Sequence, residues 1–163
     1  MRLRISTPWP YDLAVEANGE AIVAAAFERR RRSRPERLAA DPLLREAASQ
    51  VRAYFERRLQ RFDLPLFFQG PPFACEVWRC VAGLSFGEIV SYADVARAVG
   101  RPLAHRGVAM AMARTPIDLF VPAHRVIGAD GRVKGARPGS MRLRLLDFER
   151  KGRALGSGKD SRS

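Results

Sequence analysis

The sequence predicts an α+β protein in two parts, and a change of pattern near residue 70 predicts the division. Residues 1–68 contain alternating apolar residues, typical of strands, and one long run with helical spacing. Residues 69–152 contain short helical runs separated by turn residues. Between the two parts, Gln69-Gly70-Pro71-Pro72 has the composition of a linker. We therefore expect an α+β domain over 1–68, a mostly helical domain over 69–152, and a disordered polar tail over 153–163.

Composition limits the class of protein. The formal charge is +12, from 29 Lys and Arg against 17 Asp and Glu, which favours a polyanionic partner such as nucleic acid, although a solvated basic surface would give the same balance. A hydrophobic content of 47% is enough for a core. We find no apolar run of membrane-spanning length and no secretory signal, so a cytoplasmic protein is expected. Cys75, Cys80 and two histidines lack zinc-ligand spacing, so we expect two buried or half-buried thiols, no metal and no cofactor.

Strands and one helix are expected in the N-terminal part. Asp12–Ala17 alternates, Asn18-Gly19 is a tight hairpin turn, and Glu20–Phe27 is a second apolar run. Asp41-Pro42 supplies an N-cap and a first-turn proline for a helix that we expect to continue to about residue 62. Its apolar face is expected to contain Leu44, Ala48, Val51, Phe55, Leu59 and Phe62. The arginines from Arg29 to Arg34 could contact phosphates or form a solvated loop.

The second part contains a helix-turn-helix pattern. Phe73, Val77, Trp78 and Val81 form the apolar stripe of a first short helix, and a tryptophan on such a stripe is more often core than a base-stacking platform. Ser91 and Asp94 form a capping box for a helix through Val99. A turn at Arg101–Leu103 leads to a second helix over Ala104–Arg114. Small residues make this second helix thin, which suits either close packing or entry into a narrow groove, while Arg106 projects from it.

The remaining segments follow from local signals. Thr115-Pro116 ends the second helix, and the apolar run Ile117–Val121 predicts a central strand. Asp130-Gly131 predicts a hairpin turn, and Met141–Phe148 predicts a last helix.

Several motifs occur together in an order that resembles the O6-alkylguanine-DNA alkyltransferase family. They are Ser91-Tyr92, Arg106 and Val121-Pro122-x-His124-Arg125-Val126-Ile127-Gly128, and the similarity extends from Phe73 to Glu149. The resemblance implies an RNase H-like N-terminal domain and a winged-helix-like DNA-binding domain. It also implies that the second helix enters the minor groove of duplex DNA. Arg106 would fill the gap left by a flipped guanine, and Tyr92 would crowd the phosphate.

The resemblance also implies two sets of site residues. The expected DNA-binding residues are Tyr92, Ala104, Arg106, Gly107, Ala109 and Arg114. The expected lesion pocket contains Tyr92, Met112, Pro122, Ala123, His124, Arg125, Val126, Ala136 and Arg137.

Departures from the family pattern lie in this pocket. The family signature is Pro-Cys-His-Arg-Val, in which the cysteine accepts the alkyl group, but this chain has Ala123. A methyl side chain has no lone pair and cannot be a nucleophile. Thr115 replaces an asparagine, Ala136 replaces a tyrosine, and Pro138 interrupts a shortened loop. His124 with Glu149 would be the remnant of a thiol-activating relay, or His124 would now be a hydrogen-bonding residue of the pocket wall.

These departures favour an alkyltransferase-like protein that binds alkylated DNA without repairing it. Its partners would be double-stranded DNA containing O6-alkylguanine and nucleotide-excision-repair proteins, and we expect a monomer. The alternatives are a methylated-DNA–protein-cysteine methyltransferase whose acceptor cysteine has been replaced by alanine, and a helix-turn-helix regulator. A hydrolase using His124 to activate water is a weaker alternative, because no metal or second acid accompanies it.

Overall fold

The computed structural model describes residues 1–32, 41–133 and 140–160, and for residues 153–160 it describes the backbone alone. The chain divides into two compact units. Unit 1 comprises Met1–Gln69 and Pro116–Phe120, and unit 2 comprises Gly70–Thr115 and Val121–Ser163. The division after Gln69 falls one residue from the expected boundary, whereas the membership of Pro116–Phe120 in unit 1 was not foreseen.

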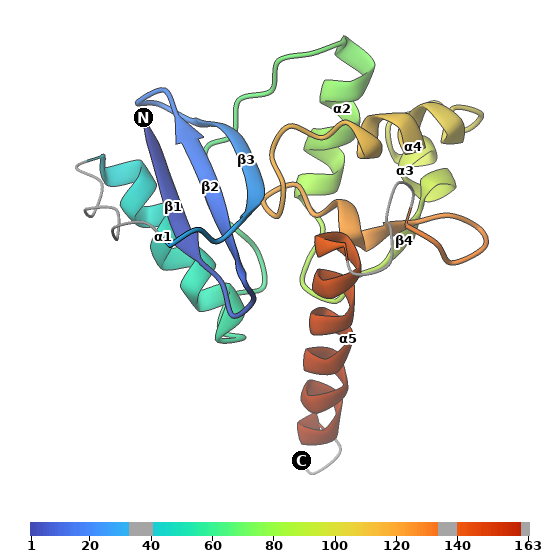
Figure 1. Cartoon of the computed structure of the whole chain (residues 1–163). Helices are drawn as coiled ribbons and strands as arrows, with labels where there is room; N and C mark the ends of the chain where they lie inside the picture. The colour runs from blue at the N-terminus through green and yellow to red at the C-terminus, as the bar shows by residue number, and fades with distance from the viewer. Residues whose placement is uncertain (33–40, 134–139, 161–163) are drawn as a thin grey trace. The chain divides into compact units, whose positions relative to one another are not determined.

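Unit 1 is built on a three-stranded antiparallel sheet in the order β1-β2-β3 (Figure 1). The strands are β1 (Arg2–Ser6), β2 (Tyr11–Ala17) and β3 (Ile22–Arg29). The hairpin predicted between β2 and β3 is confirmed. Gly19 has a φ of 96°, and Asn18 Oδ1 accepts hydrogen bonds from the backbone amides of Glu20 and Ala21, each at 2.9 Å. The turn is therefore fixed by its own side chain, which explains why it can be read from the sequence.

Helix α1 (Pro42–Phe55) packs on one face of the sheet, against β1 and β2 (Figure 1). It begins as predicted, because Asp41 Oδ1 accepts a hydrogen bond from the Leu44 amide at 3.0 Å and Pro42 occupies the first turn. The predicted end near residue 62 is wrong. Arg57 adopts a φ of 58°, and this left-handed conformation stops the helix after Phe55.

Phe62 nevertheless packs against the core of unit 1, where it is half-buried. Its ring centroid is 5.5 Å from that of Tyr54 and 4.9 Å from that of Phe120. Phe62 therefore has helical spacing relative to α1 although it belongs to the segment that follows the helix. The buried helix face also differs slightly from expectation, because Ala47 and Tyr54 are buried while Ala48 and Phe55 are half-buried.

The central strand predicted over Ile117–Val121 does not form as an extended strand. A single parallel bridge joins Ala25 of β3 to Ile117, with hydrogen bonds from Ala25 N to Pro116 O at 3.1 Å and from Asp118 N to Ala25 O at 2.8 Å. Leu119 then adopts a φ of 70° and turns the chain away. The apolar run is buried as expected of a strand, but only its first residues pair with the sheet edge.

Unit 2 is mostly helical, which confirms the α+β class of the whole chain. Its elements are α2 (Pro72–Ala82), β4 (Val90–Ser91), α3 (Tyr92–Ala98), α4 (His105–Ala113), the 3-10 turn η1 (Ala123–Arg125), β5 (Val126–Ile127) and α5 (Met141–Asp160). Strands β4 and β5 form a two-stranded parallel sheet. Trp78 of α2 is 4% exposed and donates its indole N–H to Ala111 O at 2.9 Å, so it is a core residue as predicted.

Helix α5 begins at Met141 as predicted but is longer than expected (Figure 1). The expectation of a disordered tail from Arg153 is corrected, because the backbone is helical through Asp160. No proline interrupts this stretch, so the helical backbone can continue despite two glycines. No helix in the described ranges combines the length and apolar content that a membrane-spanning segment requires.

Candidate functional site

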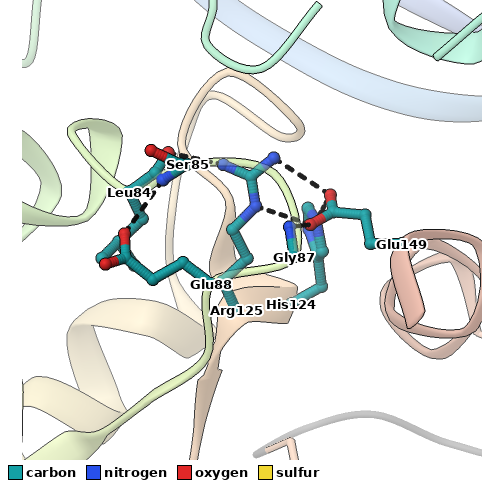
Figure 2. Close-up of polar contacts among 7 residues, drawn as sticks. All are labelled: Leu84, Ser85, Gly87, Glu88, His124, Arg125 and Glu149. Atoms are coloured by element: carbon teal, nitrogen blue, oxygen red, sulfur yellow. Dashed lines mark hydrogen bonds and ion pairs between the residues drawn. The ribbon is translucent and has the colours of Figure 1, made fainter. Parts of the chain in front are cut away.

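A buried carboxylate organises the polar centre of unit 2. Glu149 of α5 is 2% exposed and accepts four hydrogen bonds (Figure 2). Its Oε1 accepts from the Gly87 amide at 2.9 Å and from Arg125 Nε at 2.8 Å, and its Oε2 lies 3.0 Å from Arg125 Nη2 and 2.5 Å from His124 Nε2. Arg125 Nη1 also donates to Leu84 O at 2.6 Å. Three separate segments are therefore tied together by one ion-pair network: the loop that contains Leu84 and Gly87, the turn η1, and helix α5. A buried charge requires such partners.

The same network sets the ionisation of its members. Burial alone would raise the pKa of Glu149, but the hydrogen bonds and charges of His124 and Arg125 outweigh it and hold the pKa well below its usual range. Burial lowers the pKa of His124, and this effect exceeds the opposing attraction of Glu149. We therefore assign an ionised Glu149 and a neutral His124 that donates its Nε2 proton to the carboxylate, which leaves Nδ1 as an acceptor.

Ala123 lies at the start of η1, directly before this network. Its side chain is 4% exposed, and the turn is closed by hydrogen bonds from Ala123 N to Val121 O at 2.8 Å and from Arg125 N to Pro122 O at 2.9 Å. The turn thus holds residue 123 in a fixed place beside His124. Its methyl group can fill space there, but it cannot donate a proton or attack an electrophile.

Tyr92 is the first residue of α3 and is half-buried. The predicted capping box is confirmed: Ser91 Oγ accepts from the Asp94 amide at 3.0 Å, and Asp94 Oδ2 accepts from the Ser91 amide at 2.9 Å. The hydrogen bond from the Ser91 backbone is the main reason that the pKa of Asp94 is lowered. Gly128 lies beside the tyrosine ring, because a Cβ at this position would be 3.6 Å from Tyr92 Cε2 and only 2.9 Å from Asp130 Oδ1. The glycine therefore permits the loop to approach Tyr92.

Helix α4 presents a polar outer face and a small apolar inner face. Its exposed residues, together with the exposed cap residue Arg114, are His105, Arg106, Met110 and Ala113. Val108, Ala109, Ala111 and Met112 are buried. Met110 is 49% exposed. Arg106 and Arg114 form no ion pair with another described residue, so they present free positive charge at the surface.

Two of the residues expected to contact DNA have a packing role within unit 2. Ala109 is 5% exposed, so it belongs to the core of unit 2. A Cβ at Gly107 would lie 3.0 Å from Phe73 Cε1, so the glycine permits α4 to approach α2. The small size of both residues is explained by packing, which was the other explanation considered from the sequence. Ala104, the N-cap, is half-buried and remains at the edge of the outer face.

The residues expected to line the lesion pocket are mostly buried. Met112 is 1% exposed, and its carbonyl accepts from Arg142 Nη2 at 2.6 Å. Pro122 and Val126 are also buried. Arg125 was expected in the pocket wall, but its guanidinium is committed to Glu149 and Leu84. Ala136 and Arg137 lie outside the described residues.

Sequence reasoning missed several residues of this region. Leu84 and Gly87 join the Glu149 network through backbone atoms, which leave no mark in the side-chain pattern, although Gly87 has a φ of 77° that favours glycine. Met110 was missed because it was read as part of a thin helix. A cavity of about 450 Å³ lies elsewhere, in unit 1 between β1 and α1, and no residue lining it was predicted as a site residue. Within the described parts of the chain, no cluster of His, Cys, Asp and Glu side chains is arranged to hold a metal ion.

Comparisons with known proteins found similar sequences. A sequence profile of the 6-O-methylguanine DNA methyltransferase DNA-binding domain matches residues 72–151. The chain is 42% identical over 95 residues to a methylated-DNA–protein-cysteine methyltransferase of Methanosarcina barkeri, covering 58% of this chain and 60% of that protein. It is 40% identical over 111 residues to the constitutive methylated-DNA–protein-cysteine methyltransferase of Bacillus subtilis, covering 67% of each.

A solved structure extends the likeness to nearly the whole chain. The crystal structure of Mycobacterium tuberculosis OGT in complex with DNA superposes with a TM-score of 0.75 and 30% identity, covering 93% of each chain. The chain therefore belongs to the O6-methylguanine DNA methyltransferase family.

Proposed function

We propose that this protein binds O6-alkylguanine in duplex DNA and does not transfer the alkyl group. The observation that carries this proposal is Ala123, which stands where the family resemblance places the acceptor cysteine. The turn around Ala123 and the His124–Glu149 contact are both present. The surroundings of position 123 therefore resemble those of an acceptor residue, but its side chain has no reactive atom. Family membership supports the DNA-binding half of the proposal, and residue chemistry supports the non-enzymatic half.

The two cysteines of the chain are poor substitutes for the missing thiol. Both belong to α2 rather than to η1. Cys75 is 7% exposed and its Sγ lies 3.6 Å from Gly70 O. Burial raises the pKa of the Cys80 thiol, so less of it is thiolate at neutral pH than in an ordinary cysteine. Because the thiolate is the nucleophile, neither residue is expected to accept an alkyl group.

Binding would use the outer face of α4. Arg106 would enter the base stack where the damaged guanine has rotated out, and Tyr92 at the start of α3 would press on the neighbouring phosphate. Flipping costs a few kcal/mol, which the inserted arginine and the contacts to the flipped base would offset. The exposed cations Arg106 and Arg114 add the salt-dependent attraction that phosphate contacts bring.

The His124–Glu149–Arg125 network would have a supporting role in such a sensor. In an alkyltransferase a histidine beside the cysteine serves thiol activation, but here no thiol is present. The network would instead hold η1 in the shape that receives the flipped base. His124 Nδ1, the free acceptor of the neutral ring, is the atom available for a hydrogen bond in the pocket wall.

A lesion that is bound but not reversed has to be removed by other proteins. We therefore propose that the bound protein marks the lesion for nucleotide excision repair. The competing function is methyl transfer, which the similarity to methylated-DNA–protein-cysteine methyltransferases favours.

A competition binding experiment tests the proposal. Fluorescence anisotropy would compare duplexes that contain O6-methylguanine or guanine at one position, over a range of salt concentrations. We expect selective binding of the alkylated duplex, with an affinity that falls steeply as salt increases. Equal affinity for the two duplexes would contradict lesion recognition and leave only non-specific DNA binding.

A further inference from the structure

The outer face of α4 carries one large apolar side chain that lesion binding has not yet explained. Met110 is 49% exposed, whereas its neighbours Ala109 and Ala111 are 5% and 6% exposed. It therefore contributes little to the core of unit 2. Methionine is frequent at surfaces that contact partners, because its flexible side chain adapts to irregular shapes.

Met110 lies in a row with two cations. Arg106 and Arg114 are four residues before and after it, and residues four apart share one face of a helix. The row is about 12 Å long, with the methionine in the middle. A polyanion that is attracted by both arginines would therefore place Met110 against its surface. Charge complementarity favours DNA as that occupant.

We propose that Met110 makes binding depend on the base pair about two steps from the lesion, with A·T preferred to G·C. This inference rests on the proposed function, with Arg106 at the flipped nucleotide, and on the minor-groove placement of α4 that the family resemblance implies. Four residues of a helix advance about 6 Å, and two base-pair steps advance about 6.8 Å. With α4 along the groove, Met110 would lie over the groove floor two base pairs away.

The chemistry of the groove floor gives the preference. Every base pair presents acceptors there, but G·C adds the 2-amino group of guanine, which protrudes and donates hydrogen bonds. The methionine side chain has no donor, and its sulfur is only a weak acceptor. Covering the amino group with Met110 would displace its water without replacing the hydrogen bond. A buried donor left without a partner is expected to weaken binding roughly 5- to 100-fold.

Duplex substitution tests the idea with the full-length chain. Each duplex would carry one O6-methylguanine in A·T flanks, with a single G·C pair moved through the first four positions on either side. We expect an affinity loss of roughly fivefold or more at a position about two steps from the lesion on one side. Replacing that guanine by inosine, which lacks only the 2-amino group, should restore the affinity.

Two protein variants test whether Met110 causes the loss of affinity at the G·C pair. Met110→Gln keeps the length of the side chain but offers a carboxamide oxygen that can accept from the 2-amino group, so the G·C penalty should shrink to less than about twofold. The matched control is Leu143→Gln on α5, where the leucine is 37% exposed and does not belong to the α4 row. This control should keep the full penalty.

The binding measurements distinguish failure of this inference from failure of the proposed function. Lesion-selective binding with no difference between G·C and inosine·C at any position would overturn this inference and leave the proposed function intact. A penalty that persists in Met110→Gln would show that another residue causes it, which also overturns the assignment. Loss of preference for O6-methylguanine over guanine would remove the proposed function itself.

Discussion

Replacing Glu149 by glutamine should destabilise unit 2 strongly. The substitution keeps the size of the side chain but removes the charge that four hydrogen bonds surround. Arg125 is only 3% exposed, so the variant would leave a buried guanidinium without its counter-ion. Breaking a buried ion pair in this way costs about 3–5 kcal/mol. The remaining amide oxygen can still accept one hydrogen bond from Arg125, so we expect the free energy of unfolding to fall by about 3 kcal/mol.

Urea unfolding followed by tryptophan fluorescence measures this loss. The chain contains two tryptophans, Trp9 and Trp78. A Trp9→Phe background leaves only the buried Trp78, whose indole is fixed to Ala111, to report on unit 2. The unfolding midpoint should fall while the slope with urea concentration stays unchanged.

Asp147→Asn is the matched control on the same helix. Asp147 is 63% exposed and pairs with Lys151 at 2.9 Å, so its loss should cost no more than about 1 kcal/mol. If Glu149→Gln lowered the free energy of unfolding no more than Asp147→Asn does, the network would not hold unit 2 together and our account of it would be wrong.

The site residues also predict a pH dependence of stability and the effects of substitutions at Arg106, Tyr92 and Ala123. Because folding lowers the pKa of His124, the unfolded state binds an extra proton below about pH 6.5. The free energy of unfolding should therefore fall as the pH decreases from about 6.5, by up to about 1.4 kcal/mol per pH unit. An unchanged urea midpoint between about pH 7.5 and about pH 5.5 would refute this prediction. The lowered pKa of Glu149 extends the loss to pH values below 4.5, where the unfolded carboxylate becomes protonated. Arg106→Ala should weaken binding of the alkylated duplex by about 1–3 kcal/mol and binding of the plain duplex by less. Tyr92→Phe should have a smaller effect. If a titration showed that both affinities fall in parallel, Arg106 would be an ordinary phosphate contact. Ala123→Cys should give at best slow methyl transfer, because an error of about 1 Å in placing the guanine costs roughly 100-fold in rate. Protein mass measures the transfer. Fast, stoichiometric transfer would mean that the rest of the site is intact.

Structure fixed by local hydrogen bonds was predictable. The Asn18-Gly19 turn, the Asp41 cap and the Ser91–Asp94 capping box each satisfy backbone amides with a side chain a few residues away. Such signals do not depend on the rest of the fold. The end of α1 was not predictable in this way, because Phe62 keeps the helical spacing while it packs on Tyr54 from outside the helix.

The candidate site was only partly predictable for a related reason. The order of motifs placed Tyr92, Arg106 and His124, because each carries a recognisable side chain. The partners of Glu149 were not visible in the sequence, since Gly87 is 62 residues away and binds through its backbone amide. The sequence also did not show which small residues of α4 are buried. Glycine and alanine fit both a groove and a helix interface, and only the structure shows that Ala109 is buried.

The central claim is that the protein binds an alkylated guanine without accepting its alkyl group. The most direct test is mass spectrometry of the full-length chain after incubation with an excess of O6-methylguanine duplex, followed by analysis of the DNA recovered from the complex. We predict a complex that forms preferentially on the alkylated duplex, a protein of unchanged mass, and DNA that still contains O6-methylguanine. A protein heavier by one methylene unit, together with restored guanine, would contradict the claim and show that the chain is a methyltransferase.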